Sequence, residues 1–186
     1  SPEPFSGQAN MNGSGKVEWA LAWPLDQEPY FSSYCNTVPT PLGGTHEAGF
    51  RSGLLRALKN HAEMLSVKQA SKITGDDLLG GSGAMLSVFI PEPQFQGQTK
   101  EKLVSVSTTK LVENVIRDHF EHWLSADTET ARALIDYTVE RAEDRLRKRQ
   151  DKQTKRKSAT RRLRLPGKLS DCTRNSSAGT EIFLVE

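Results

Sequence analysis

A glutamine and a lysine stand two positions apart in a polar loop, where both could contact a phosphate group. Gln98-Thr99-Lys100 lies within residues 94–107, which the sequence predicts to be a loop containing one aromatic residue. A lysine ammonium supplies a point charge to a phosphate oxygen, and a neighbouring glutamine amide can donate a second hydrogen bond. Such a triplet is also typical of a solvated surface loop, so both interpretations stay open at this point.

Two glycine-containing runs are candidate anion sites. Gly43-Gly44-Thr45-His46 leads into a predicted helix, whose free N–H groups and dipole favour an anion. The alternative is an ordinary helix cap in which His46 bonds a backbone group. The run from Gly167 to Ser170 superficially resembles a phosphate loop, but Arg162 stands where that motif requires glycine and Leu169 follows the lysine. The phosphate-loop interpretation is therefore rejected.

Three further residues, a histidine pair and a glutamate, are candidates for metal-ligand chemistry. His119 and His122 stand three apart on a predicted helix, but zinc would need at least one further ligand, so a packed or exposed pair is favoured. Glu186 follows an apolar run, and a carboxylate at the end of a strand can hold Mg²⁺ or transfer protons. An ordinary glutamate at a strand end explains that position equally well.

The strongest signal from residue types alone is the distribution of charge. Residues 141–168 hold 13 Lys/Arg and 3 Asp/Glu, a net charge of +10, whereas the rest of the chain carries −8. A basic strip on an acidic protein is typical of contact with a polyanion such as DNA. No aromatic residue lies between Tyr137 and Phe183, so backbone contact without base stacking is expected. A solvated helix is the alternative. The candidate DNA-binding residues are Arg149, Lys152, Arg156, Lys157, Arg161, Arg162 and Lys168.

Composition excludes several classes of protein. The 186 residues are 35% hydrophobic and contain no apolar run near the ~20 residues that a membrane helix needs. The first residues have neither the basic nor the apolar region of a signal peptide. Cys35 and Cys172 are too few for a disulfide framework or a four-cysteine zinc site, so two reduced thiols in a cytoplasmic protein are expected.

Hydrophobic patterning predicts an α+β protein. Residues 17–23 and 30–38 are expected to be strands paired in a hairpin, after a loop over residues 1–16 that holds at most a ragged strand. An apolar stripe predicts a helix over 46–65 with Thr45 as its N-cap. Residues 85–90 are expected to form a buried strand.

The remaining predicted elements are mostly helical. Thr74 to Asp77 resembles a capping box that opens a short helix, and a second amphipathic helix begins at Thr108. Asp127 or Thr128 caps a third helix of ~30 residues, or ~45 Å, whose second half has no apolar face. Residues 181–186 have the pattern of a buried strand belonging to a further domain.

Four runs occur together in the order found in one known family. The run from Asn36 to His46, with Gly49-Phe50 after it, resembles the start of the transducer domain of bacterial type IIA topoisomerases. The run from Pro93 to Leu103 resembles that family's Q-T-K loop. Leu165–Cys172 and Thr180–Glu186 resemble the start of its Toprim domain. Val17–Leu21 resembles the topoisomerase IV branch of the family more than the gyrase branch.

The resemblance implies a fold and a set of roles. The fold is α+β, similar to domain 2 of ribosomal protein S5, followed by a long helix and the first strand of a Toprim domain. Lys100 would reach the γ-phosphate of ATP held by a preceding GHKL domain, with Gln98 beside it. Glu186 would take part in an Mg²⁺ site that is incomplete here, because the chain ends before the family's other metal ligands. ATP and Mg²⁺ are the cofactors of the full-length protein, and none is expected on this chain alone, which should be inactive by itself.

The resemblance also implies a domain division and partners. Residues 1–16 would link to the ATPase domain, 17–126 would form the transducer domain, 127–160 the long basic helix, and 161–186 the truncated start of the Toprim domain. The implied partners are double-stranded DNA, the cleavage subunit of topoisomerase IV in a heterotetramer, and the chain's own ATPase domain. The implied location is the cytoplasm, at the nucleoid.

Three functions are consistent with these features. The first is a transducer that relays ATP binding and hydrolysis to DNA-strand passage in an enzyme that decatenates and relaxes DNA. The second is the equivalent segment of a gyrase, which supercoils DNA. The third, from another class, is a non-enzymatic module that binds DNA through its basic helix.

Overall fold

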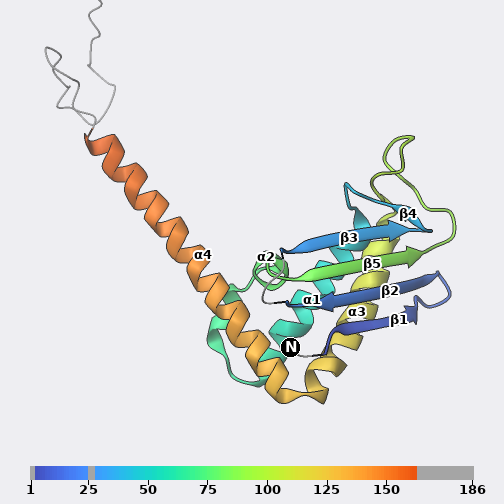
Figure 1. Ribbon diagram of the computed structural model, residues 1–186, viewed down its shortest axis with the longest axis horizontal. Coiled ribbons are helices and arrows are strands. Elements are labelled where there is room, and N and C mark those ends of the chain that lie inside the picture. The colour runs from blue at the N-terminus through green and yellow to red at the C-terminus, as the bar shows by residue number, and fades with distance from the viewer. Residues whose placement is uncertain (1–2, 25–27, 163–186) are drawn as a thin grey trace, which may run out of the picture. The chain divides into compact units, whose positions relative to one another are not determined.

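The structure, a computed structural model, describes residues 3–24 and 28–162, and for 155–162 it describes the helical backbone. By internal contacts the chain divides into residues 1–144 and residues 145–186. The elements of the first unit are the strands and helices of an α+β domain (Figure 1). The predicted fold class is therefore confirmed, and the predicted strand of residues 181–186 lies outside the described residues.

Five strands form one mixed sheet. They are β1 (Phe5–Asn10), β2 (Lys16–Ala22), β3 (Tyr30–Cys35), β4 (Val38–Pro39) and β5 (Gly83–Phe89). Their order is β1-β2-β5-β3-β4, with β3 and β5 parallel and the other neighbours antiparallel.

The predicted pairing of the two early strands is wrong. β5 lies between β2 and β3, so the hairpin partner of β2 is β1, from the stretch expected to be mainly loop. Residues 5–10 read FSGQAN, which has little β propensity. Antiparallel pairing with β2 therefore holds them in the extended conformation. β5 pairs with β2 and β3, which are far from it in the sequence, so no local pattern predicts the strand order of the sheet.

One face of the sheet is covered by two helices, α1 (Thr45–Met64) and α3 (Val106–Ala126), which lie side by side (Figure 1). The predicted stripe of α1 is buried at Phe50, Leu54 and Leu58, whereas Leu65, at its end, is 37% exposed. Alternation along β2 buries Val17, Trp19 and Leu21 against the helices.

Small residues let α1 and α3 approach closely. A Cβ at Gly49 would lie 2.4 Å from the Thr109 carbonyl oxygen, and one at Gly53 would lie 2.7 Å from the Glu113 carbonyl oxygen. Any larger side chain at either position would push the helices apart. The two glycines are therefore required by packing, four residues apart on one face of α1.

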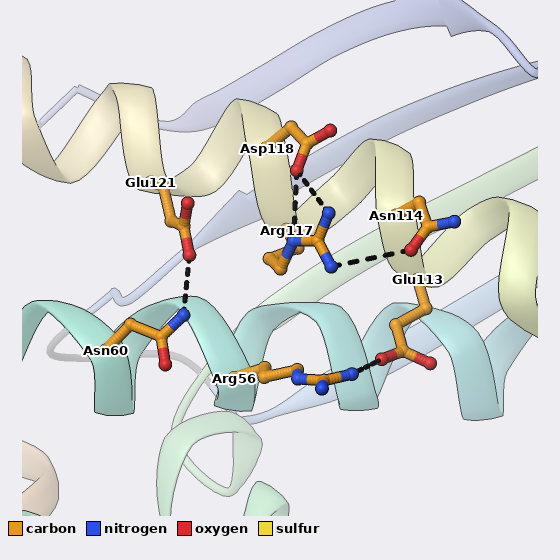
Figure 2. A network of polar contacts seen from close by, with 7 residues as sticks. All are labelled: Arg56, Asn60, Glu113, Asn114, Arg117, Asp118 and Glu121. Atoms are coloured by element: carbon orange, nitrogen blue, oxygen red, sulfur yellow. Dashed lines mark hydrogen bonds and ion pairs between the residues drawn. The ribbon is translucent and has the colours of Figure 1, made fainter.

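Polar contacts tie the exposed edges of the same two helices together (Figure 2). The Arg56 guanidinium lies 2.6 Å from the Glu113 carboxylate, and the Asn60 amide donates to Glu121 at 2.8 Å. Arg117 bonds the adjacent Asp118 at 2.7 Å. Glu113 is buried, but Arg56 and the Asn60–Glu121 pair are exposed, so the contacts between the helices fix their register more than they add stability.

An aromatic cluster closes one end of the core. Phe120 of α3 is fully buried, and its ring centroid lies 4.8 Å from that of Phe5 and 5.5 Å from that of Trp123. Trp19 and Trp23 complete the cluster, and the Trp23 indole N–H donates to the Leu78 carbonyl at 2.9 Å.

The predicted start of the short helix is confirmed, whereas α1 and α3 begin one and two residues before the expected positions. The short helix α2 (Gly75–Leu79) has the expected capping box, with Thr74 and Asp77 bonded at 2.8 Å. In α1 the N-cap is Gly44 and Thr45 is already helical, one residue from the expected start. A single 3-10 turn, η1 (Lys68–Lys72), joins α1 to α2.

The long helix α4 (Thr128–Arg162) begins in the first unit and ends in the second. Asp127 caps it, since its carboxylate accepts from the backbone N–H groups of Glu129 and Thr130 at 3.0 and 3.1 Å. A bond from the Thr130 hydroxyl, together with these backbone bonds, lowers the pKa of Asp127. The buried stripe within the first unit is Ala131, Leu134, Ile135, Thr138 and Ala142.

Candidate functional site

The predicted phosphate-contacting loop is a small hairpin-like lobe over residues 94–104, here called the Q-T-K loop. The Gln96 N–H donates to the Lys102 carbonyl at 2.9 Å, and the Val104 N–H donates to the Gln94 carbonyl at 2.8 Å. Phe95 and Leu103 form an isolated antiparallel bridge. The loop predicted from its polarity therefore has its own backbone order.

Three backbone hydrogen bonds attach this loop to the segment before α1. The Leu42 N–H donates to the Glu101 carbonyl at 3.1 Å, and the Thr45 N–H donates to the Leu103 carbonyl at 3.0 Å. The Leu103 N–H donates back to the Gly43 carbonyl at 3.1 Å. Because the Leu103 side chain is fully buried, the base of the loop is part of the core.

Gly44 makes this attachment possible. Its φ is +144°, and a Cβ there would lie 2.2 Å from the Leu103 carbonyl oxygen. No other residue combines that backbone conformation with so close an approach. The residues from Thr40 to Gly44, here called the glycine turn, and the Q-T-K loop are therefore in direct backbone contact.

The tip of the loop presents the predicted residues to solvent. Gln98, Thr99 and Lys100 are all exposed, and Lys100 has φ +58°, in the left-handed region. The Thr99 hydroxyl donates to Glu101 at 3.2 Å, whereas Gln98 and Lys100 bond no side chain that the structure describes. Both side chains are therefore accessible from solvent.

The anion-site interpretation of the helix start gains no support from the structure. His46 is fully buried, and the Thr45 N–H, one of the free donors expected there, is taken by the Leu103 carbonyl at 3.0 Å. The expectation that His46 bonds a backbone group is also wrong, because its Nε2 lies 3.0 Å from the Thr40 hydroxyl. Burial lowers the pKa of His46 to about 4, so the imidazole is neutral at physiological pH.

Behind the glycine turn lies a chain of polar side chains that the sequence did not reveal. Ser33 of β3 lies 2.6 Å from the Thr40 hydroxyl and 2.6 Å from a Glu47 carboxylate oxygen. Ser33 and Thr40 are buried. No motif marks these residues, since a strand, a turn and a helix start bring them together.

The predicted DNA-binding residues fall on α4 and beyond it. Arg149 and Lys152 are exposed on the helix, and Arg156, Lys157, Arg161 and Arg162 follow on its helical backbone. Lys168 and Glu186 lie outside the described residues. The basic helix is thus continuous as far as Arg162, two residues past the expected limit at residue 160.

Metal and thiol chemistry find no support among the described residues. His119 and His122 are exposed, with the ring of His119 centred 5.1 Å from that of Trp19. Within residues 3–24 and 28–162, no three His, Cys, Asp or Glu side chains gather where they could hold a metal ion. Cys35 is a buried free thiol whose pKa is raised to about 11 by burial.

Comparison with known proteins decides the family. A family model described as DNA gyrase B matches residues 1–154. The chain belongs to the DNA gyrase B family. The resemblance of its motifs to bacterial type IIA topoisomerases is thereby confirmed.

Curated members of this family match along the whole chain. The B subunit of DNA topoisomerase 4 from Bartonella bacilliformis is 52% identical over 185 residues, covering 99% of this chain and 27% of that protein. The protein of the same name from Caulobacter vibrioides is 49% identical, covering 100% of this chain and 28% of that protein. The chain thus spans little more than a quarter of the length of these relatives. Their name is that of the branch indicated by Val17–Leu21.

Solved structures of the family share the fold. The ATP-binding domain of Francisella tularensis topoisomerase IV superposes with a TM-score of 0.71 at 33% identity, covering 77% of this chain and 40% of that one. The 43K ATPase domain of Thermus thermophilus gyrase B gives a TM-score of 0.72 at 28% identity, covering 83% of this chain and 42% of that one.

No helix in the described part of the chain has both the length and the apolar character needed to cross a membrane.

Proposed function

We propose that this chain is the transducer segment of an ATP-dependent type II DNA topoisomerase of the topoisomerase IV type. In this role it relays ATP binding and hydrolysis in a preceding GHKL domain to DNA-strand passage, which decatenates and relaxes DNA in the cytoplasm, at the nucleoid. The support is membership of the DNA gyrase B family and about 50% identity to proteins named as B subunits of DNA topoisomerase 4. The chain spans 27% of one such protein, and this proposal assigns the nucleotide-binding and cleavage sites to the remaining length.

The observation that carries the proposal is the Lys100 side chain at the tip of the Q-T-K loop. It is exposed, it bonds no side chain that the structure describes, and the loop beneath it is fixed by backbone hydrogen bonds. A lysine ammonium suits a phosphate as a point charge, and it stabilises charge on a transferring phosphoryl group. The Gln98 amide, two residues away, can donate to a neighbouring phosphate oxygen.

The relay follows from the same lysine. A positive charge that is drawn to the terminal phosphate of bound ATP loses that partner after hydrolysis and release. The loop is bonded directly to the start of α1, so movement of Lys100 acts on the helical layer. In this proposal, residues 17–126 form a transducer domain similar to domain 2 of ribosomal protein S5, and residues 1–16 link it to the ATPase domain.

The basic helix has a separate role in the proposal. Residues 127–160 form one leg of a DNA clamp, in which Arg149, Lys152, Arg156 and Lys157 contact phosphates, and Arg161, Arg162 and Lys168 continue the contact beyond it. Residues 161–186 begin the Toprim domain, in which Glu186 would join other carboxylates around Mg²⁺. Mg²⁺ supplies charge stabilisation there when bound. The cleavage subunit completes the heterotetramer.

The test is Lys100→Ala in the full-length protein assembled with its cleavage subunit. Loss of one charge-stabilising donor should lower ATP turnover roughly 10²- to 10³-fold, while DNA binding stays unchanged. Lys102→Ala is the matched control, since this lysine is also exposed and lies in the same loop. Unimpaired turnover in Lys100→Ala would exclude the γ-phosphate role.

Two alternatives are separated by activity. A gyrase segment predicts that the assembled enzyme introduces negative supercoils with ATP, whereas topoisomerase IV relaxes and decatenates only. A non-enzymatic DNA-binding module is favoured by the exposed Arg149 and Lys152 alone, and it predicts that Lys100→Ala changes nothing. A supercoiling assay and the ATP turnover of Lys100→Ala therefore distinguish all three.

A further inference from the structure

The four polar side chains behind the glycine turn form one hydrogen-bonded chain. It runs from His46 Nε2 to the Thr40 hydroxyl at 3.0 Å, then to the Ser33 hydroxyl at 2.6 Å, and ends at Glu47 Oε1 at 2.6 Å. His46, Thr40 and Ser33 are 0%, 1% and 6% exposed, so water does not compete for the first two links.

The number of protons available fixes which group donates in each of these hydrogen bonds. The Ser33 hydroxyl has one proton and two possible acceptors, Glu47 Oε1 at 2.6 Å and the Thr40 carbonyl at 3.1 Å. An ionised carboxylate only accepts, so the shorter contact requires that Ser33 donate to Glu47. The contact between the hydroxyls then requires Thr40 to donate to Ser33, and His46 must donate through Nε2–H to Thr40. His46 Nδ1 carries no proton in this arrangement, and it has no hydrogen-bond partner among the described residues. The fall of the His46 pKa to about 4 agrees with a neutral imidazole.

The carboxylate at the end of the chain touches the turn that holds the Q-T-K loop. A Cβ at Gly43 would lie 2.8 Å from Glu47 Oε2, so the carboxylate is packed against the Gly43 backbone. Gly43 also donates its N–H to the Thr40 carbonyl at 2.8 Å and accepts from the Leu103 N–H at 3.1 Å. Thr40 and Glu47 thus hold the glycine turn from opposite ends.

The path from these contacts to Lys100 is short. Leu42, inside the turn, donates to the carbonyl of Glu101, which is the residue after Lys100. Gly43 of the turn and Thr45 directly after it bond the Leu103 N–H and carbonyl respectively. A displacement of the turn therefore displaces the backbone that carries the lysine.

We propose that Glu47, Ser33, Thr40 and His46 are positioning residues for Lys100, holding the glycine turn so that the lysine reaches a terminal phosphate. This inference rests on the proposed role of Lys100. None of the four touches the nucleotide; they act through the backbone of the turn and the loop. Removing the Glu47 carboxylate leaves the Ser33 hydroxyl with only the Thr40 carbonyl, at 3.1 Å, as an acceptor, and it releases Gly43.

The test compares Glu47→Ala with Glu47→Gln in the full-length protein assembled with its cleavage subunit. A misplacement of about 1 Å can cost up to about 100-fold in rate, so Glu47→Ala should lower kcat for ATP roughly 10- to 100-fold. KM should change less than about threefold, because the lysine contact strengthens in the transition state. Glu47→Gln keeps an acceptor of equal reach for Ser33 and should restore kcat to within about threefold.

Hydrogen exchange followed by mass spectrometry supplies the second readout. Glu47→Ala should speed exchange in residues 40–46 and 96–105, where the amides of Leu42, Thr45 and Leu103 lie. Thr74→Ala is the matched control, because it breaks a partly buried capping contact away from the turn. It should lower stability without changing kcat or exchange in these segments.

Each outcome bears on one proposal. Normal turnover in Glu47→Ala, together with inactive Lys100→Ala, would overturn the positioning role alone. Equal kcat losses in Thr74→Ala and Glu47→Ala would overturn it too, because general stability would then explain both. If Lys100→Ala turns over normally, the proposed function fails instead. Should Glu47→Ala not fold, Ser33→Ala breaks the same chain at its middle and carries the same expectation.

Discussion

The first unit of the chain and the C-terminal half of α4 (residues 145–162) obey different physical rules. Residues 1–144 hold 12 Lys/Arg and 19 Asp/Glu, and they bury a core of aromatic and aliphatic side chains. Residues 145–162 hold 10 Lys/Arg and 1 Asp/Glu, with Leu146 and Ala159 as their apolar residues. The first region is stabilised by burial, whereas the second has helix-forming residues and no stripe to bury. Substitutions in the two regions should therefore change different measurements.

The largest expected effect is on stability in the first unit. Phe120→Ala should lower the free energy of unfolding by about 4 kcal/mol, because the side chain is fully buried in the aromatic cluster. Gln153→Ala, in the C-terminal half of α4, should change it by less than about 0.5 kcal/mol. Urea unfolding of the 186-residue chain, followed by circular dichroism, measures both. Similar losses would contradict the contrast between the regions.

A pH titration should produce the next largest effect, also in the first unit. The pKa of His46 falls from 6.5 to about 4 on folding, so the unfolded chain binds a proton first as the pH drops. The contribution of neutral His46 to the free energy of unfolding is complete above pH 6.5. It is lost as the pH falls from 6.5 to about 4, where the free energy of unfolding should fall by about 3 kcal/mol. His46→Gln should remove this component of the pH dependence, and the exposed His119→Gln should keep it. Identical pH profiles for the two variants would disprove the assignment.

The C-terminal half of α4 should respond through DNA affinity instead. Changing Arg149, Lys152, Arg156 and Lys157 together to Gln should weaken duplex binding of the full-length protein roughly 100-fold. The slope of log affinity against log salt concentration should become shallower by about 3 to 4. The unfolding free energy of the first unit should stay the same. The matched control changes four exposed cations of the first unit to Gln: Lys68, Lys102, Lys110 and Arg132. Equal losses of affinity in both variants would show that total charge matters more than its location.

The smallest expected effect comes from a helix cap. Thr74→Ala removes the hydroxyl of the α2 capping box and should cost about 1 kcal/mol in unfolding free energy. Ser107→Ala, an exposed hydroxyl in the first turn of α3, serves as the reference. The same urea titrations resolve this difference, and a null result for Thr74→Ala would mean that the box adds no stability.

Local patterns predicted the helices well. The stripe from Phe50 to Ala62 marked α1, and the capping pair Thr74 and Asp77 marked α2, because both depend on neighbours within one turn. Leu65 did not fit, since α1 ends at Met64 and the chain turns there through Ser66 at φ +60°.

Long-range pairing was beyond the sequence pattern. The order of the sheet depends on β5 inserting between β2 and β3, which are neighbours along the chain. Local polarity predicted that Gln98 and Lys100 lie in an exposed loop, whereas no local pattern predicted the contacts among Ser33, Thr40, His46 and Glu47. Their residue types are ordinary, and three separate elements have to fold before they meet.

The aromatic cluster has a practical consequence. All three tryptophans of the chain, Trp19, Trp23 and Trp123, lie in it, within 6.5 Å of a neighbouring ring centroid. Intrinsic tryptophan fluorescence therefore reports on one end of the core alone, without any introduced dye. A ligand that moves only the Q-T-K loop, or DNA that binds only to residues 145–162, should leave this emission constant while other probes change. A shift in the emission would show that the event has reached the packing of β1, β2 and α3.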